Sequence, residues 1–414
     1  MSGKTKVVIT GLGVISPVGN TVGEMWDNIR NGVSGIARTT RFDPSRVDSK
    51  ISGEVKQFDI TQYVDPKEAR RMALFTQYAL AAARQAWQDA GLADGGADPE
   101  RVGVFVGNGI GGKEVDDEAY QVLFNRGPGR LSPMLIPKLI ANEAAGNISI
   151  ALKAQAAVHT LVTACASGTD ALGVAMDMIR AGRADVMIAG GTEATVTEYC
   201  VGGFCSMKAL STKYNDTPEK ACRPFDAGRD GFIMGEGSAI LILEGEAHAR
   251  ARGARIYAEL AGYGASGDAY HLTAPDPEAA GAIRAIRLAL KDAGLAPDEI
   301  DYVNAHGTST PLNDPMETKA VKTVFGDHAR KLKMSSTKSM TGHMLGAAGA
   351  IEALICTLAI RDGFYPPTIN YTTPDPACDL DVVPNQGVNG PIRAALSTSL
   401  GFGGHNGVLV LKSV

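Results

Sequence analysis

A strand–turn–helix unit occurs twice in this 414-residue chain, and the repeat restricts the folds that the chain can adopt. In the first copy, an apolar, β-branched run leads into a turn at Cys165, and residues 171–180 carry apolar side chains at helical spacing. In the second copy, a strand-like segment leads into a glycine-bounded turn at His343, which is followed by an alanine-rich helix over residues 347–360. Internal duplication into two similar α/β halves that face each other is the simplest interpretation.

Further strand-like segments alternate with helical ones, which predicts a mostly parallel sheet covered by helices on both faces. We interpret the basic, helical segment 246–255 as the connection between a first half, residues 1–250, and a second half, residues 251–414. A long helix is predicted from Asp65 to Gly91. The other strands are expected within residues 7–10, 101–107, 184–191, 238–243, 300–307, 394–400 and 407–412.

Composition and charge argue against several function classes. A net charge of −5 provides no overall basic field for nucleic acid. The six cysteines form no CxxC pair and no regular framework, so neither a disulfide scaffold nor a zinc site is expected. There is no signal-peptide core and no apolar run near the ~20 residues of a membrane span, so a soluble, cytoplasmic protein is expected. The glycines after Thr10 lack the third glycine of a dinucleotide loop, and Pro17 stands where its helix should run, which disfavours a nicotinamide or flavin site.

Cys165 is the first candidate for chemistry, because it stands at the predicted N-terminus of a helix. The helix dipole and free backbone N–H groups there are expected to lower the pKa of the thiol and favour the nucleophilic thiolate. A buried structural cysteine is the alternative interpretation. His306 and His343 also fall in glycine-bounded turns at strand or helix ends, where ligands bind in α/β folds. A cysteine with two histidines can support nucleophilic acyl chemistry.

Four ordered motifs resemble the β-ketoacyl synthases, the condensing enzymes of fatty acid and polyketide synthesis. The resemblance covers essentially the whole chain and implies a thiolase-like fold, in which two duplicated α/β halves form α-β-α-β-α layers. The loop 223–237 and the segment 365–370 are similar to the stand-alone bacterial members that elongate fatty acids. The four motifs are Thr163-Ala-Cys-Ala-Ser167, Asn304-Ala-His-Gly-Thr-Ser-Thr310, Lys338-Ser-Met-Thr-Gly-His-Met-Leu-Gly-Ala-Ala-Gly349 and Gly401-Phe-Gly-Gly404.

This resemblance implies a catalytic role for each matching position. Cys165 would accept the acyl group, while His306 and His343 would serve decarboxylation of the malonyl group and polarise its thioester carbonyl. Lys338 and Glu352 would form an ion pair that supports the site. The scheme requires no redox cofactor and no metal, and it leaves open whether a monovalent cation binds near Asn304 and Glu352.

The resemblance also implies how the substrate is held. Thr308 and Thr310 would bind the phosphopantetheine arm that the partner, an acyl carrier protein, brings with it. The backbone N–H groups of Cys165 and Phe402 would form an oxyanion hole, within a loop that includes Gly403, and the Phe402 ring would gate the acyl pocket.

A basic patch and an oligomeric state follow from the same resemblance. The positions that would meet the acidic carrier protein are Lys67, Arg70, Arg71 and Lys208. Without the resemblance, a charged run such as 67–71 would indicate only a solvated helix face. Members of the family are homodimers, so a homodimer is expected.

Three alternatives stay open to different degrees. A thiolase shares the fold but usually carries a second catalytic cysteine, and the late glycine loop 401–405 has none. The ketosynthase of a type II polyketide system is a closer rival within the same chemistry. A non-catalytic partner subunit that only sets chain length would lack the nucleophile, whereas Cys165 is present with both histidines.

Overall fold

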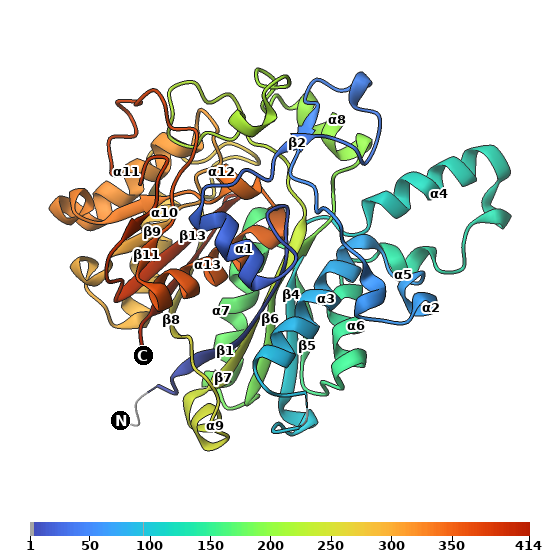
Figure 1. Cartoon of the computed structure of the whole chain (residues 1–414), viewed down its shortest axis with the longest axis horizontal. Coiled ribbons are helices and arrows are strands. Elements are labelled where there is room, and N and C mark those ends of the chain that lie inside the picture. The colour runs from blue at the N-terminus through green and yellow to red at the C-terminus, as the bar shows by residue number, and fades with distance from the viewer. Residues whose placement is uncertain (1–3, 94) are drawn as a thin grey trace.

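The computed structural model describes residues 4–93 and 95–414, where ten strands form one sheet built from two similar halves (Figure 1). From edge to edge the strand order is β10-β9-β13-β14-β8-β1-β7-β6-β4-β5. The first half contributes β1 (Val7–Ile15), β4 (Val102–Gly107), β5 (Val158–Leu161), β6 (Val186–Glu193) and β7 (Gly237–Gly245). The second half contributes β8 (Ala258–Gly267), β9 (Tyr302–Asn304), β10 (Lys333–Ser335), β13 (Ala394–Gly401) and β14 (His405–Lys412).

Both halves have the same topology, which confirms the duplication. From the outer edge to the centre, the strands of the first half are β5, β4, β6, β7 and β1, and those of the second half are β10, β9, β13, β14 and β8. In both halves these are the third, second, fourth, fifth and first strands in chain order. In each half the outer three strands run parallel and the inner pairs run antiparallel. The halves join through a short antiparallel pairing of β1 with β8 over Val7–Ile9.

The prediction of a mostly parallel sheet is wrong. Antiparallel pairing joins β6 to β7, β7 to β1, β1 to β8, β8 to β14 and β14 to β13, so it dominates the middle of the sheet. These strands are apolar along their length because helices cover both faces, and such continuous runs do not reveal strand direction.

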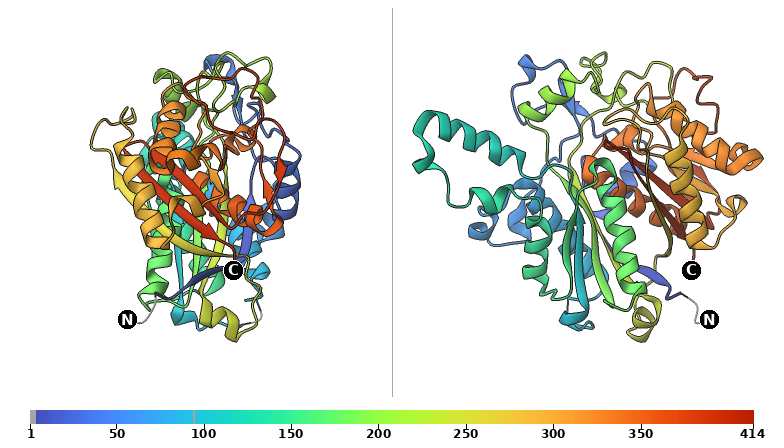
Figure 2. Two further views of the ribbon diagram at one scale, coloured as in Figure 1. Left: turned by 90° about the vertical axis from the view of Figure 1, so that its left-hand side faces the viewer. Right: turned by 180° about the vertical axis from the view of Figure 1, so that it is seen from behind.

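Helices complete the five predicted layers. At the centre, α7 (Ser167–Arg180) and α13 (Ala348–Asp362) pack on each other and on strands of both halves. The right-hand view of Figure 2 shows α7, in green, lying against the strands of the first half. The outer face of the first half is covered by α3 (Leu74–Asp89) and α6 (Glu143–Leu152). The outer face of the second half is covered by α10 (Ala280–Ala293) and α11 (Asn313–Phe325).

Glycines inside the two central strands bring the outer helices close to the sheet. A Cβ atom at any of four glycines would lie 1.9 to 2.4 Å from a carbonyl oxygen of an alanine in the covering helix. The same Gly-x-Gly pattern therefore allows a helix to pack closely on the sheet in each half. The contacts are Gly11 with Ala86, Gly13 with Ala82, Gly262 with Ala289, and Gly264 with Ala285. The glycines after Thr10 lie within β1 and form no loop.

The helix expected from Asp65 to Gly91 is two helices. The first, α2 (Pro66–Ala69), ends early, and α3 begins only at Leu74. Ala73 is extended at the N-terminus of α3, and the Leu74 N–H donates to the Glu114 Oε1 atom at 2.6 Å. This distant carboxylate caps the helix, so the break has no local sequence signal.

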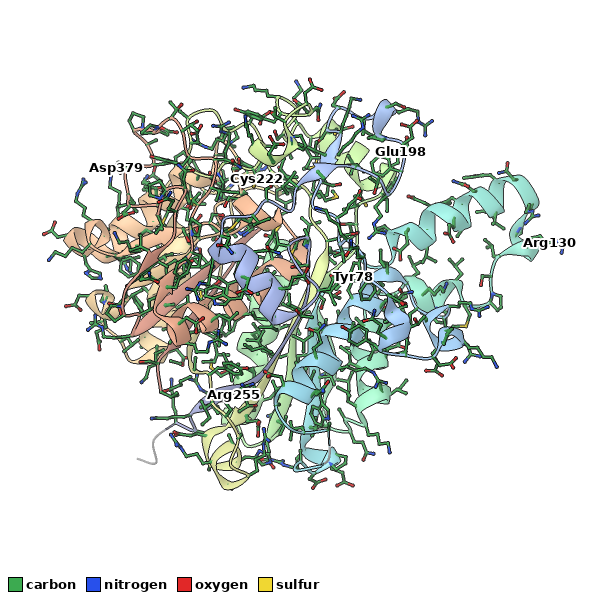
Figure 3. All side chains as sticks on the ribbon, viewed as in Figure 1. Tyr78, Arg130, Glu198, Cys222, Arg255 and Asp379 are labelled. Atoms are coloured by element: carbon green, nitrogen blue, oxygen red, sulfur yellow. The ribbon has the colours of Figure 1, made fainter. Side chains whose placement is uncertain are left out.

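One segment, residues 113–142, projects from the body, and we call it the arm. It contains α4 (Lys113–Arg126) and α5 (Leu135–Leu139), and neither helix has a buried residue. Figure 3 shows Arg130 near its tip with side chains directed into solvent. The remaining elements are α1 (Val22–Arg30), β2 (Ala37–Arg38), β3 (Ile51–Ser52), α8 (Glu198–Ser206), α9 (Glu246–Ala251), α12 (Lys338–Thr341), β11 (Phe364–Tyr365) and β12 (Val388–Asn389). None of the helices described is both long enough and apolar enough to cross a membrane.

Candidate active site

A cavity of about 420 Å³ lies where the strand ends of the two halves meet, and Cys165, His306 and His343 share its wall. Cys165 stands in the 3-10 turn Ala164–Ala166 at the start of α7. His306 follows β9, and His343 lies between α12 and the turn that begins α13. The fold therefore brings together all three residues that the sequence placed in separate glycine-bounded turns.

The geometry of the three groups is compact. The Cys165 Sγ atom lies 3.0 Å from the His343 Nε2 atom. The rings of His306 and His343 meet edge to face, with centroids 5.2 Å apart and planes at 87°. Cys165 is only 8% exposed, and both histidines are 2% exposed. A proton on the thiol can therefore pass directly to His343.

The prediction of a lowered thiol pKa is wrong for Cys165. Burial raises the pKa of Cys165 to about 11, and it outweighs the lowering effects of Lys338 and of the Phe402 backbone N–H group. The turn does supply stabilising N–H groups, as expected, but the cost of burying a charge is larger. The resting residue is a neutral thiol, so its sulfur must lose a proton before it can act as a strong nucleophile.

Both histidines are neutral. Burial, together with the nearby Lys338 ammonium group, holds the pKa values of His306 and His343 well below the usual range. Lys338 is itself buried and ion-paired with Glu352, as the sequence motifs implied. Burial raises the pKa of Glu352 to about 7, against the lowering effect of Lys338. Neutral imidazoles can donate N–H groups to a negatively charged oxygen.

The three donor atoms of Cys165, His306 and His343 lie within 4.8 Å of one another, a spacing that a metal ion could also use. The Lys338 charge acts on both imidazoles, so it opposes a cation at the same point. The arrangement therefore suits proton transfer and the stabilisation of negative charge better than metal binding.

The site contains positioning groups that sequence reasoning missed. The buried Glu317 carboxylate accepts the backbone N–H groups of His306 at 2.7 Å and Gly307 at 2.8 Å, and it also accepts the Thr398 hydroxyl. This clamp fixes the His306 turn. The available signal was the cluster of polar and acidic residues, Asn313 to Thr318, in the buried first turns of α11.

A second missed clamp holds the Cys165 turn. Asp170 accepts hydrogen bonds from the Thr163 hydroxyl at 2.6 Å and from the Tyr263 hydroxyl at 2.8 Å. Tyr263 comes from β8 in the other half, so no local pattern could have revealed the pair. The bond ties the nucleophile turn to the second half of the sheet.

The residues expected around the substrate line the same cavity. The hydroxyls of Thr308 and Thr310 are 3.0 Å apart, and both residues line the wall. The Phe402 backbone N–H faces the Cys165 thiol, and the Phe402 ring lies 6.3 Å from that of Phe204. Gly403 has φ of +86°, a conformation that favours glycine, which suits the tight loop at the end of β13.

Only part of the expected basic patch lies at the cavity. Lys208 is exposed at its rim. Lys67, Arg70 and Arg71 are exposed on and just after α2, and they are not part of the cavity wall. Within one copy of the chain, the structure does not gather these four residues around one entrance.

Models of the beta-ketoacyl synthase N-terminal and C-terminal domains match residues 4–249 and 257–372. A 3-oxoacyl-[acyl-carrier-protein] synthase 2 from Staphylococcus aureus is 52% identical over 412 residues, which cover 100% of this chain and 99% of the relative. The enzyme of the same name from Coxiella burnetii is 52% identical over 411 residues, 99% of each chain. A solved type II polyketide ketosynthase, in complex with its acyl carrier protein and bound to the hexaketide, aligns over 100% of both chains with 40% identity and a TM-score of 0.92. With these matches along its whole length, the chain belongs to the β-ketoacyl synthase family.

Proposed function

We propose that this chain is a fatty acid elongation enzyme that condenses an acyl group, held on Cys165, with malonyl-acyl carrier protein. The products are 3-oxoacyl-acyl carrier protein and carbon dioxide. The observation that carries the proposal is the 3.0 Å contact between the Cys165 Sγ and His343 Nε2 atoms, beside a second neutral histidine in one cavity.

Acyl transfer comes first. The Cys165 sulfur attacks the thioester carbonyl of the acyl carrier, and its proton passes to His343. The tetrahedral oxyanion accepts the backbone N–H groups of Cys165 and Phe402. When the intermediate collapses, the carrier thiol leaves with the proton, and the acyl group stays on Cys165. One thioester replaces another, so the step needs little driving force.

Condensation follows decarboxylation. The malonyl thioester loses carbon dioxide, and the electron pair of the broken bond forms an enolate. Neutral His306 and His343 each donate one N–H group to the enolate oxygen, and for this step His343 is the tautomer with its proton on Nε2, the nitrogen that is bare when it accepts the thiol proton. The enolate carbon then attacks the acyl carbonyl, the carbon–sulfur bond breaks, and Cys165 leaves as a thiolate that takes up a proton. The first half of the chain supplies the acyl acceptor and the second half supplies both histidines.

Incubation with acyl carriers of several chain lengths tests this function. Intact-protein mass spectrometry should detect one acyl group on Cys165, and addition of malonyl carrier should release it as a 3-oxoacyl product lengthened once. Repeated extension of one chain would instead favour a type II polyketide ketosynthase, the alternative suggested by the solved relative. No acylation at all would favour a non-catalytic partner subunit and contradict the proposal.

The carrier protein is proposed to dock on the basic residues, with its phosphopantetheine arm passing Thr308 and Thr310. Lys67→Glu combined with Arg71→Glu should therefore slow reactions of carrier-bound substrates and make their rates less sensitive to salt. Small acyl-coenzyme A substrates should react nearly as before.

The control for this prediction is Arg287→Glu with Lys291→Glu, which reverses two exposed charges on one face of α10. It should leave both substrate classes unchanged. An equal loss for carrier-bound and small substrates in the Lys67 and Arg71 variant would show that these residues are structural.

Phe402 is proposed to gate the acyl pocket. Its ring lies between flanking glycines and beside Phe204, so it can swing as the acyl chain enters. Phe402→Ala should slow acylation of Cys165 on the order of tenfold or more, with a smaller effect on malonyl decarboxylation. Rapid-quench measurements of the two half-reactions check this. Equal effects on both would argue against a gate.

A homodimer is also proposed. The strand β5 is the last strand of the sheet, and its outer edge has no neighbour among the described residues. Apolar side chains beside this edge and along the arm are exposed, including Phe124 at 81%, Ile150 at 80% and Val162 at 58%. A second copy pairing along this edge would cover them.

A monovalent cation is also proposed, near the ion pair. The side-chain oxygens Asn304 Oδ1, Ser397 Oγ and Glu352 Oε2 are buried without a hydrogen-bond partner in the described chain. Asn304 and Ser397 are paired residues of β9 and β13. Oxygen ligands of this kind suit a hard cation, which would neutralise buried negative charge and support the Lys338 pair.

A further inference from the structure

Glu193, at the end of β6, is a fully buried carboxylate outside the catalytic scheme. Its Oε2 atom accepts the backbone N–H groups of Gly109 at 2.9 Å and Gly346 at 3.0 Å, and the Ile110 N–H also points to it. Its Oε1 atom has no partner among the described residues. No salt bridge forms to it in the described chain, so backbone N–H groups alone compensate the buried charge. Burial of a charge without an oppositely charged partner costs free energy.

The three N–H groups belong to two segments, one that lines the catalytic cavity and one that follows His343. Gly109 and Ile110 follow β4 and line the cavity, and Ile110 packs in the same apolar cluster as Cys165. Gly346 comes three residues after His343, at the start of α13. One carboxylate therefore joins the wall beside the nucleophile to the turn that carries the base.

The Glu193 contact with the Gly346 turn can be compared with the corresponding turn in the other half of the chain. Aligning the end of α7 at Arg180-Ala-Gly182 with the end of α13 at Arg361-Asp-Gly363 makes Cys165 correspond to Gly346. In the first copy, the end of β13 lies on the turn, and the Phe402 N–H faces the thiol. In the second copy, the end of β6 lies on the turn, and the Glu193 carboxylate binds there. The helix N-terminus that holds a reacting sulfur in one half thus holds a structural anion in the other.

Resting on the condensation reaction proposed above, we propose that Glu193 is a positioning residue for acyl transfer. Its carboxylate fixes the Ile110 wall against the turn after His343, and this spacing determines how the acyl chain lies beside Cys165.

The charge of Glu193 varies near neutral pH. Burial raises the pKa of Glu193 to about 7, against the lowering effect of the three N–H groups. The proton can go to the unpartnered Oε1 atom, after which Oε2 remains an acceptor but a weaker one. The titratable groups that feel the charge are the thiols of Cys165, in the nucleophile turn, and Cys200, on α8. The ionised carboxylate raises the pKa of Cys165, which opposes loss of the thiol proton, so the gain in rate at high pH has to come from the stronger clamp.

The pH dependence of stability distinguishes a positioning role of Glu193 from a purely structural role. The pKa in the folded protein lies above the ordinary value of 4.5, so the folded state binds this proton more tightly than the unfolded state does. The stability associated with the proton is present below about pH 4.5 and is lost as pH rises to about 7. Glu193→Gln keeps the shape without the ionisation, so this variant should melt no lower than the wild type at pH 8.

The test is the rate of Cys165 acylation by an acyl carrier in wild type and Glu193→Gln between pH 6 and 8. The ratio of the two rates should rise from near one at pH 6 to about tenfold at pH 8, because only the wild type gains the ionised clamp. A ratio cancels the titration of other groups, including Glu352. The effect should also shrink in an Ile110→Ala background, if Glu193 acts through that wall.

Glu114→Gln is the matched control. The Glu114 carboxylate also accepts one backbone N–H, has an unpartnered oxygen in the described chain and has a pKa raised by burial, but it does not line the cavity. Its rate ratio should stay flat with pH. A flat ratio for Glu193→Gln, or an activity loss that follows a lower melting temperature, would overturn the positioning role. A wild-type enzyme that is never acylated would instead overturn the condensation reaction itself.

Discussion

Replacement of Cys165 by alanine is expected to abolish condensation, a loss on the order of 10⁶-fold, as when other covalent nucleophiles are removed. Release of carbon dioxide from malonyl carrier protein should continue. The physical reason is that the thiol accepts the acyl group, whereas His306 and His343, both neutral and buried in the same cavity, stabilise the enolate. The measurement is labelled carbon dioxide release alongside acyl-enzyme formation.

The histidine variants are the matched comparison. His306→Ala or His343→Ala should lower decarboxylation by about 10²–10³, the usual loss for one oxyanion donor. His306→Ala should leave acylation less affected than His343→Ala, because only His343 contacts the sulfur, at 3.0 Å. If a folded Cys165→Ala protein releases no carbon dioxide, the division of labour between the thiol and the histidines fails.

The second large effect concerns the buried ion pair. Lys338 and Glu352 are each 1% exposed, so Lys338→Met leaves an unpaired carboxylate in the core. The free energy of unfolding should fall by about 3–5 kcal/mol, the usual cost of removing one partner of a buried pair. The pKa values of His306 and His343 should rise, because the positive charge of Lys338 helps to hold them down.

The double variant Lys338→Met with Glu352→Leu separates stability from chemistry. It leaves no unpaired charge, so urea unfolding should show most of the lost stability restored. Decarboxylation should stay impaired, because burial then lacks the help of the Lys338 charge in holding the pKa values of both histidines down. Full recovery of activity with stability would mean that the pair is only structural.

Much of the fold could be predicted because the duplication leaves similar turn and helix-end motifs in the two halves of the sequence. The turns at Cys165 and His343, and the Arg-x-Gly ends of the following helices, marked corresponding places in the two halves. Strand direction was not readable, since β7 and β14 are buried on both faces just as parallel strands are. The glycines of β1 resembled a loop motif in the sequence. They are required because the backbone of α3, about 70 residues later in the chain, packs against them and leaves no room for a Cβ atom.

The candidate catalytic residues lie in recognisable sequence motifs, but the residues that position them do not. Cys165, His306 and His343 each stand in a glycine-bounded turn, so their convergence could be predicted. Glu193 is a single acidic residue at the end of an apolar strand, and its three donors come from distant segments. The predicted pKa of Cys165 is wrong for a related reason: a helix N-terminus can be recognised in the sequence, whereas the extent of burial depends on the second half of the chain.

The shared central layer has a consequence for how the chain folds. Because α7 and α13 each pack on strands of both halves, a half on its own would leave one side of its central helix in water. The repeat is therefore not expected to behave as two independent domains, and we expect the halves to melt together in one cooperative transition. A gene split near residue 250 would yield two fragments that become soluble only by complementing each other, even though each contains a complete five-stranded unit.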